Sequence, residues 1–303
     1  MTADTAWQPD PRWVSVPGGP ASTGVWLAEL DHRTLVVKRL SPPEPDDREA
    51  LHPRASTYWR READVALDGL LDGSRGVRAP EVLRVEEDPG GVTIWTARVD
   101  DAANNGLYLA HALGTLALTP VEDRPWLARD VLAGRLARFA TRGGWPTLAR
   151  TTLADVADRI WQRRTHHLAT LEALPQVLTH GDATPRNLLG RDGDDVVAVD
   201  WSTVGTGAVG SDLGYLALSV REDLDTLLAA YGEALGGSSS EARAGARAGA
   251  TVTAAYTALC RAEWALARVA SGPGALAGKY RHPAVAPYLR SLQRLFPQLE
   301  ALL

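Results

Sequence analysis

Cysteine is nearly absent from this chain, because Cys260 is the only one in 303 residues. A single thiol excludes an intrachain disulfide and a zinc site built from clustered cysteines, and it agrees with a reducing compartment. No apolar stretch approaches the roughly 20 residues that span a bilayer. Residues 1–11 lack the basic-then-apolar order of a signal peptide. We therefore expect a soluble, cytoplasmic protein with no membrane partner.

Lysine is also rare: of the 32 lysines and arginines, only Lys38 and Lys279 are lysines. Against such a bias, a lysine suggests a site that needs a compact ammonium rather than a planar guanidinium. The net charge of −5 and the lack of a basic run argue against a nucleic-acid partner and mildly favour a cationic one.

The first third of the chain has the pattern of a small antiparallel sheet with one helix. Runs of β-branched and apolar residues between Gly/Pro turns predict strands, and a helix is expected from about Arg54 to Leu71, closed by Gly73 and Gly76. The predicted strands are residues 13–16, 24–30, 34–37, 80–85 and 91–99.

From about residue 102 the pattern changes to helices, the longest of them expected over residues 151–171. Short strands are expected at 177–179, 188–189 and 196–199, and one flexible break at 236–240. The fold class predicted is α+β with two lobes. These are a small antiparallel-sheet lobe over residues 1–98 and a larger, mainly helical lobe over residues 99–303.

The clearest chemical pattern lies between residues 178 and 201. The segment LTHGDATPRNLL (178–189) is followed, after a hairpin, by VAVDW (197–201). The same order, H-x-D-x-x-x-x-N and then a second Asp, places a catalytic Asp and two Mg²⁺ ligands in protein kinases. Phosphoryl transfer needs an acceptor for the hydroxyl proton and hard oxygen ligands for Mg²⁺. Asp182 suits the first role, and Asn187 and Asp200 suit the second.

Any one of these residues alone is explained better as part of a polar turn. The ordered set indicates a phosphotransferase. The segment resembles the H-G-D-x-x-x-x-N and I-D-W signature of the aminoglycoside phosphotransferase and choline kinase superfamily, to which Gly181 and Trp201 fit better than to protein kinases.

Asp212, in SDLGYL, matches the family's later Asp-Leu-Ala element, whose Asp braces the catalytic loop; an N-cap is the alternative reading. Eleven residues between Asp200 and Asp212 leave no room for a protein-kinase activation segment, which favours a small-molecule kinase.

The resemblance also implies roles in the N-terminal lobe. Lys38 stands where the family's third strand carries the lysine that contacts the nucleotide phosphates; a strand-end surface lysine is the alternative. Its expected partner is a helical glutamate, for which Glu62 is the best placed and Glu49 is the alternative. The cofactors implied are ATP, with GTP possible as well, and Mg²⁺.

The remaining nucleotide contacts rest on weaker matches. The loop of residues 17–24 carries glycines whose backbone N–H groups could face a phosphate, and Ser22 and Thr23 would add hydroxyl donors. An ordinary hairpin turn explains this loop nearly as well. The strand that ends near residues 97–100 should form the hinge, where Val99 contacts adenine and Trp95 lines the pocket from behind.

The mechanism we expect is in-line transfer of the γ-phosphoryl group to a hydroxyl, with Asp182 as the proton acceptor. His180 belongs to the catalytic set, although it is expected to hold the loop rather than to titrate. Arg186 would neutralise charge on the transferring group, or lie exposed on the loop.

The acceptor is not readable from the sequence. Candidate pocket residues on the helices are acidic or aromatic: Asp155, Asp158, Glu263, Trp264 and Tyr256. A small-molecule hydroxyl such as that of an antibiotic, an amino alcohol or a sugar would fit, as would a Ser/Thr of a biosynthetic peptide. A nucleotide-binding pseudokinase scaffold and a protein kinase are the other hypotheses, and the oligomeric state is open.

Overall fold

An antiparallel sheet forms the N-terminal part of the chain in the computed structural model, which describes residues 7–19, 22–236, 239–271 and 276–303. Its strands are β1 (Val14–Val16), β2 (Gly24–Leu30), β3 (Arg33–Leu40), β5 (Val82–Asp88) and β6 (Gly91–Ala97). They lie in the order β1-β2-β3-β6-β5, and each neighbouring pair is antiparallel. The predicted small antiparallel sheet is confirmed.

One face of this sheet packs against α2 (Arg61–Asp68), which follows the short α1 (Arg48–Leu51). Leu40, Val92 and Ile94 of the sheet bury apolar surface against Ala63 of α2. The opposite face carries a separate cluster in which tryptophans predominate, formed by Trp13, Trp26, Ala28, Leu35, Val37 and Trp95. The sheet is therefore apolar on both faces.

The predicted helix over residues 54–71 is wrong in its length. Gly69 adopts a left-handed conformation with φ of 72° and ends the helix, as glycine commonly does. Before the helix, the chain turns around the buried side chain of Arg61, which donates hydrogen bonds to the carbonyl groups of Pro53 and Ala55. A tertiary contact thus replaces helix in this stretch.

Two small sheets carry the segment with the kinase-like pattern. Their strands are β4 (Val77–Arg78), β7 (Gln176–Thr179), β8 (Gly190–Asp192), β9 (Asp195–Val197) and β10 (Gly205–Ala208). β9 pairs with β8 and, in parallel, with β4, while β7 pairs with β10. The strand expected at 188–189 begins two residues later as β8, and β10 was not predicted because its sequence, GTGA, has no strand pattern.

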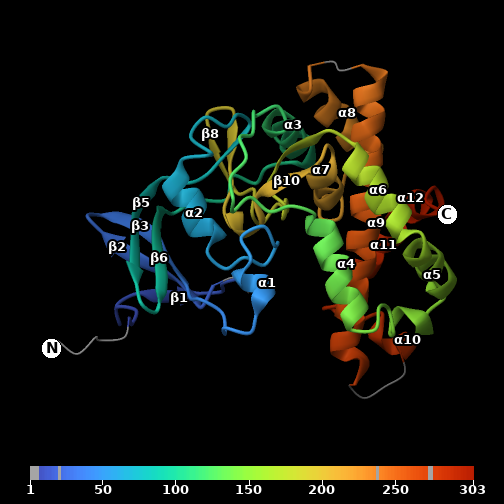
Figure 1. The fold of residues 1–303 in the computed structure, drawn as a ribbon, viewed down its shortest axis with the longest axis horizontal. Helices are drawn as coiled ribbons and strands as arrows, with labels where there is room; N and C mark the ends of the chain where they lie inside the picture. Colours follow the sequence, from blue (N-terminus) through green and yellow to red (C-terminus); the bar gives the residue numbers. More distant parts are fainter. Residues whose placement is uncertain (1–6, 20–21, 237–238, 272–275) are drawn as a thin grey trace.

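The rest of the chain is helical, as expected, and lies to the other side of the molecule (Figure 1). The helices are α3 (Gly106–Leu116), α4 (Val131–Thr141), α5 (Ala154–Gln162), α6 (Arg164–Ala173), α7 (Ser211–Leu216), α8 (Leu224–Ala234), α9 (Ser240–Ala270), α10 (Leu276–Lys279), α11 (Ala286–Arg294) and α12 (Phe296–Glu300), with the 3₁₀ turns η1 (Leu148–Arg150) and η2 (Trp201–Thr203). Among the described elements, none is long and apolar enough to cross a membrane.

The long helix predicted over residues 151–171 is instead a pair, α5 and α6, which meet at Arg163. The longest described helix is α9, with 31 residues. It is the centre of an apolar core to which α4, α5, α11 and α12 contribute. Of the predicted break at 236–240, residues 237 and 238 lie outside the described part of the chain.

Candidate active site

The loop that follows β7 carries His180, Asp182 and Asn187 and bends sharply at its second residue. Gly181 has φ of +79°, and a Cβ atom there would collide with the carbonyl oxygen of Thr203. The Thr203 hydroxyl in turn donates a hydrogen bond to the His180 carbonyl at 3.1 Å. This position therefore requires glycine, and the loop is held against the segment that follows Asp200.

Asp212 holds the same loop from the other side. Its carboxylate accepts hydrogen bonds from the backbone N–H groups of His180 at 2.6 Å and of Gly181 at 2.9 Å. Burial raises the pKa of this carboxyl above its ordinary value, although His180 and the two backbone hydrogen bonds lower it in part. Asp212 is not the N-cap of α7, since Gly210 has that position. The contacts match the brace that was expected of it.

His180 is fully buried and lies against the ring of Trp201, with ring centroids 4.6 Å apart. Its Nε2 lies 3.0 Å from the carbonyl oxygen of Val199, which can only accept, so Nε2 carries the proton. Nδ1 then accepts the backbone N–H of Asp182 at 3.3 Å. Both ring nitrogens are used by the protein, so His180 positions the loop and has no free atom for a substrate.

Asp182 and Asn187 are joined directly. The Asn187 side-chain amide donates to the Asp182 carboxylate and to the Asp182 carbonyl, both at 2.9 Å. Tyr215 lies near this carboxylate: burial raises the pKa of Tyr215 and the charge of Asp182 raises it further, while Arg135 and Arg261 lower it. The amide of Asn187 orients the Asp182 carboxylate.

Lys38 connects the five-stranded sheet to the end of the β8–β9 hairpin. Its ammonium donates to the Asp200 carboxylate at 3.0 Å and forms an ion pair with Glu62 of α2. Burial would lower the pKa of Lys38, but the two carboxylates raise it well above its usual range, so the side chain stays charged. Burial likewise opposes the charge of Asp200, yet Lys38 lowers the pKa of this carboxyl below its ordinary value. The alternative partner, Glu49, pairs with Arg138 instead.

The residues predicted to bind Mg²⁺ present oxygen atoms of the right kind. The Asn187 amide nitrogen is used by Asp182, which leaves Oδ1 without a hydrogen-bond partner among the described residues. The Val199 N–H donates to the Asn187 carbonyl at 2.8 Å and keeps Asn187 next to Asp200. Two hard oxygen ligands suffice for Mg²⁺, which keeps several waters and takes its other ligands from phosphates. The described residues contain no larger cluster of metal-binding side chains, and this pair fits the ion.

The glycine-bearing loop lies over the same carboxylate. A Cβ atom on Gly19 would be 3.3 Å from Asp200 Oδ2, so the backbone passes close to the proposed metal side. Ser22 donates its hydroxyl to the Gly19 carbonyl at 3.0 Å, and Thr23 donates to the Arg39 carbonyl at 3.2 Å. Neither hydroxyl faces Lys38 in this arrangement. Pro20 and Ala21 of the predicted loop lie outside the described residues.

The expectation for Trp95 is corrected by the register of the sheet. Lys38 stands opposite Ile94 in the β3–β6 pair, so the two side chains share the face that packs on α2. Trp95, one residue on, points to the other face, where it meets Trp13 edge-on at 5.1 Å. It cannot line a pocket that contains Lys38. Val99 does lie in the connection after β6, where it contacts Gly190 at the start of β8.

Arg61 is a positioning residue that the sequence analysis missed. It is fully buried and donates at 2.8 Å to the carbonyl of Ser202, two residues beyond Asp200, and at 2.7 Å to that of Trp126. These bonds fix α2, and with it Glu62, relative to the Asp200 segment. No sequence signal distinguishes a buried arginine from its exposed neighbours on a helix.

The acidic and aromatic candidates for the acceptor pocket are used elsewhere. Asp155 and Asp158 are exposed on α5. Glu263 is buried and accepts the backbone N–H groups of residues 147 and 148. Trp264 is exposed beside Tyr288, and Tyr256 donates its hydroxyl to the Ile160 carbonyl inside the core. Arg186 is exposed and makes no hydrogen bond or ion pair with any described residue.

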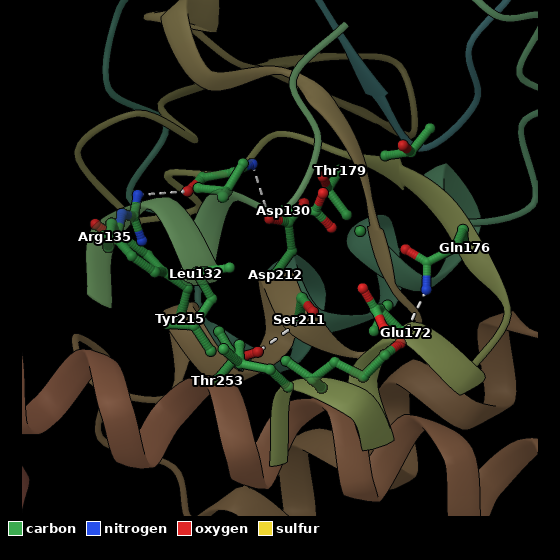
Figure 2. A pocket seen from close by; sticks show the side chains of 18 of the residues that line it. Asp130, Leu132, Arg135, Glu172, Gln176, Thr179, Ser211, Asp212, Tyr215 and Thr253 are labelled. Carbon is green, nitrogen blue, oxygen red and sulfur yellow. Dashed lines mark hydrogen bonds between the residues drawn. The ribbon is translucent and has the colours of Figure 1, made fainter. Parts of the chain in front are cut away.

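A cavity of about 400 Å³ lies instead between α4, α6, α7 and α9 (Figure 2). Arg135 and Tyr215 line one end, and Glu172 and Gln176 line the other. Gly181, whose carbonyl accepts a hydrogen bond from Arg135, also lines the cavity. Its size is within the range of small-molecule sites. None of the five candidate residues lines it.

The sequence profile of the phosphotransferase enzyme family matches residues 13–249, which is most of the chain. The chain belongs to this family. It is therefore a phosphotransferase. No curated protein matches it in sequence.

Solved structures of relatives share the fold. An aminoglycoside-3'-phosphotransferase of type VIII is 20% identical with a TM-score of 0.51, over 80% of this chain and 93% of that one. A choline/ethanolamine kinase family protein from Mesorhizobium loti is 19% identical with a TM-score of 0.55, over 95% and 92%. Choline kinase LicA from Streptococcus pneumoniae is 12% identical with a TM-score of 0.58, over 95% and 94%. At these identities the likeness establishes the two-lobed kinase-like fold alone.

Proposed function

We propose that this phosphotransferase uses ATP and Mg²⁺ and transfers the γ-phosphoryl group to a hydroxyl of a small molecule bound in the cavity beside Asp182. The observation that carries the proposal is the bond between Lys38 and Asp200, which are 162 residues apart. It joins a cation suited to nucleotide phosphates with a carboxylate suited to Mg²⁺, next to the Asp182–Asn187 pair. We also propose that the two lobes divide near residue 98, just after β6, with the nucleotide between them.

The reaction assigned to these residues is one balanced displacement. The acceptor oxygen forms a bond to the γ-phosphorus, the bond from that phosphorus to the β–γ bridging oxygen breaks, and ADP leaves. Asp182 accepts the hydroxyl proton, held for this by Asn187. Lys38 binds the nucleotide phosphates, and Glu62 keeps its ammonium in place. When bound by Asn187 and Asp200, Mg²⁺ supplies charge neutralisation on the phosphates.

Two variants test these roles because they should fail differently. Lys38→Ala should weaken nucleotide binding and slow transfer with every acceptor, since it removes the phosphate contact. Asp182→Asn keeps the shape but removes the proton acceptor, so turnover should fall by ~10²-fold or more while nucleotide affinity stays near wild type. Calorimetric titration with ATP and Mg²⁺ reports the affinity. An ATP-consumption screen over aminoglycosides, peptides, macrolides, amino alcohols and sugars finds an acceptor for the turnover assay.

Matched controls exist for both changes. Lys279→Ala removes the other lysine of the chain, and Asp192→Asn removes an exposed carboxylate of the neighbouring hairpin. Both should bind nucleotide and turn over as the wild type does. If the wild type binds no nucleotide in the presence of Mg²⁺, or if Asp182→Asn weakens nucleotide binding and leaves turnover of the bound complex unchanged, the assignment is wrong. GTP in place of ATP in the same titration decides the donor base.

A further inference from the structure

Two arginines from different helices lie against the ring of Tyr215. The guanidinium carbon of Arg135, on α4, is 4.9 Å from the ring centroid, and that of Arg261, on α9, is 4.2 Å from it. Both arginines are half-buried. Arg135 and Tyr215 stand together at one end of the cavity, across from Glu172 and Gln176 (Figure 2).

Neither arginine forms an ion pair with a described carboxylate. Arg135 donates one hydrogen bond, to the Gly181 carbonyl at 3.0 Å, and Arg261 donates none among the described residues. One turn along α4, Arg138 shows the usual arrangement, because it pairs with Glu49. Removing charged groups from water is unfavourable unless they are paired. Two guanidinium groups that keep most of their N–H donors free therefore suit a ligand with negative charge.

The two arginines are close to the reacting group. Arg135 donates to the carbonyl of Gly181, the residue before Asp182, and Tyr215, which both arginines contact, is close enough to Asp182 for this carboxylate to raise the Tyr215 pKa. A group bound by the arginines would thus lie near the proposed base. Three carboxylates line the cavity, those of Asp130, Glu172 and Asp212, and none of them forms an ion pair with either arginine.

We propose that the acceptor carries an anionic group, a carboxylate or a phosphate, which Arg135 and Arg261 bind while the acceptor hydroxyl faces Asp182. This inference rests on the proposed function and names the chemical class of its substrate. The planar fork of a guanidinium matches both kinds of anion in a bidentate manner. It replaces the expectation of a cationic acceptor, for which the acidic residues Asp155, Asp158 and Glu263 were candidates.

Small hydroxyl compounds of matched size test the charge. The full-length protein, saturated with a non-hydrolysable ATP analogue and Mg²⁺, is titrated with 4-hydroxybutyrate, glycerol 3-phosphate, 4-hydroxybutyramide and 4-amino-1-butanol. Binding is followed by NMR of the arginine Nε–Hε signals, assigned with the variants. The carboxylate or the phosphate should shift the Arg135 and Arg261 signals, and the stronger of the two identifies the anion. The neutral and cationic probes should leave both signals in place.

The variants give the second readout. Arg135→Gln and Arg261→Gln should each weaken the preferred anion by ~10-fold or more, since a hydrogen bond to a charged group is lost, and Arg261→Glu should reverse the preference between 4-hydroxybutyrate and 4-amino-1-butanol. Arg268→Gln is the matched control, because Arg268 lies on the same helix but over the ring of Trp264 instead of that of Tyr215. Thermal melting shows that each variant is folded.

Several results overturn the proposal. The first is equal affinity for all four probes or a higher affinity for the amine. The second is no change in the NMR signal of either arginine when the anions are added. The third is an equal loss of affinity for all four probes in the arginine variants. Failure of the proposed function looks different, because it shows in the nucleotide titration and in Asp182→Asn. If the protein binds ATP with Mg²⁺ but binds the charged and neutral probes equally, the proposed function stands and only the anionic acceptor is refuted.

Discussion

Asp212 offers the sharpest test of how the fold holds the catalytic loop. Its two carboxylate oxygens accept the backbone N–H groups of His180 and Gly181 at 2.6 and 2.9 Å, in a buried position. Asp212→Ala removes both acceptors and leaves two buried N–H groups without partners. Asp212→Asn keeps the shape and one acceptor oxygen, but places an NH₂ group against the second N–H.

The size of the effect follows from these two bonds. A hydrogen bond to a charged group contributes about 1.5–3 kcal/mol, so Asp212→Asn should lower the free energy of unfolding by that amount. Asp212→Ala should lose about twice as much, about 3–6 kcal/mol. A domain is stable by about 5–15 kcal/mol, so the Ala variant approaches unfolding and the Asn variant is the informative one. A shift of about 1 Å in the loop should also lower the turnover of Asp212→Asn by ~10²-fold.

Urea unfolding followed by circular dichroism measures the stability, and steady-state ATP consumption measures the turnover. Asp225→Asn is the control, because Asp225 is exposed and pairs with Arg247 on the surface; its effect should stay within about 0.5 kcal/mol. If Asp212→Asn unfolds at the wild-type midpoint and turns over at the wild-type rate, Asp212 does not hold the loop.

Three further predictions follow from single positions. Gly181→Ala should place a Cβ against the Thr203 carbonyl at a positive φ, and should cost about 1–2 kcal/mol in strain alone, measured by urea unfolding; an unfolding midpoint equal to that of the wild type would contradict it. Asp123→Asn should destabilise the protein at pH values above 3.8 but not near pH 2. Hydrogen bonds from Arg54 and Arg129 lower the pKa of Asp123 from 3.8 to about 2, so the stabilisation that its carboxylate gives is fully present above pH 3.8 and is lost as the pH falls toward 2. The melting temperatures of variant and wild type should therefore converge as the pH falls from 3.8 to 2, and a constant difference would refute this. Trp95→Leu should lower the free energy of unfolding by about 0.5–3 kcal/mol. It should leave the ATP affinity measured by calorimetry unchanged, because Trp95 lies on the face away from Lys38. A weaker ATP affinity would show that Trp95 does line the nucleotide pocket.

The proposed catalytic residues could be picked out from the sequence because they follow one another at short spacing on a loop between strands. His180, Asp182 and Asn187 lie within eight residues, so local geometry alone brings them near each other. The strands of the first third were found because their β-branched runs are bounded by Gly/Pro turns. The pairing of Lys38 with Glu62 came from family resemblance, and the ion pair in the structure supports it.

The misplaced residues share a cause, which is that a side chain's surroundings depend on partners distant in sequence. Trp95 was assigned to the pocket from its position near the hinge, but register with β3 turns it to the opposite face. Glu263 and Tyr256 looked like substrate-binding residues, yet they serve a 3₁₀ turn and a helix carbonyl more than ninety positions away. Arg61, which binds only carbonyl oxygens, resembles its neighbour Arg60 in every local respect.

The residue types that phosphoryl transfer requires could be read from the sequence, because they occur in a fixed order on one short loop and the hairpin after it. The class of the fold could be read as well, because strand and helix patterns change along the chain near residue 100. The side chains around the proposed acceptor site could not, because they come from helices that are distant in sequence. Arg135 and Arg261 come from α4 and α9, and they meet at Tyr215 only because packing of the helical core brings these helices together.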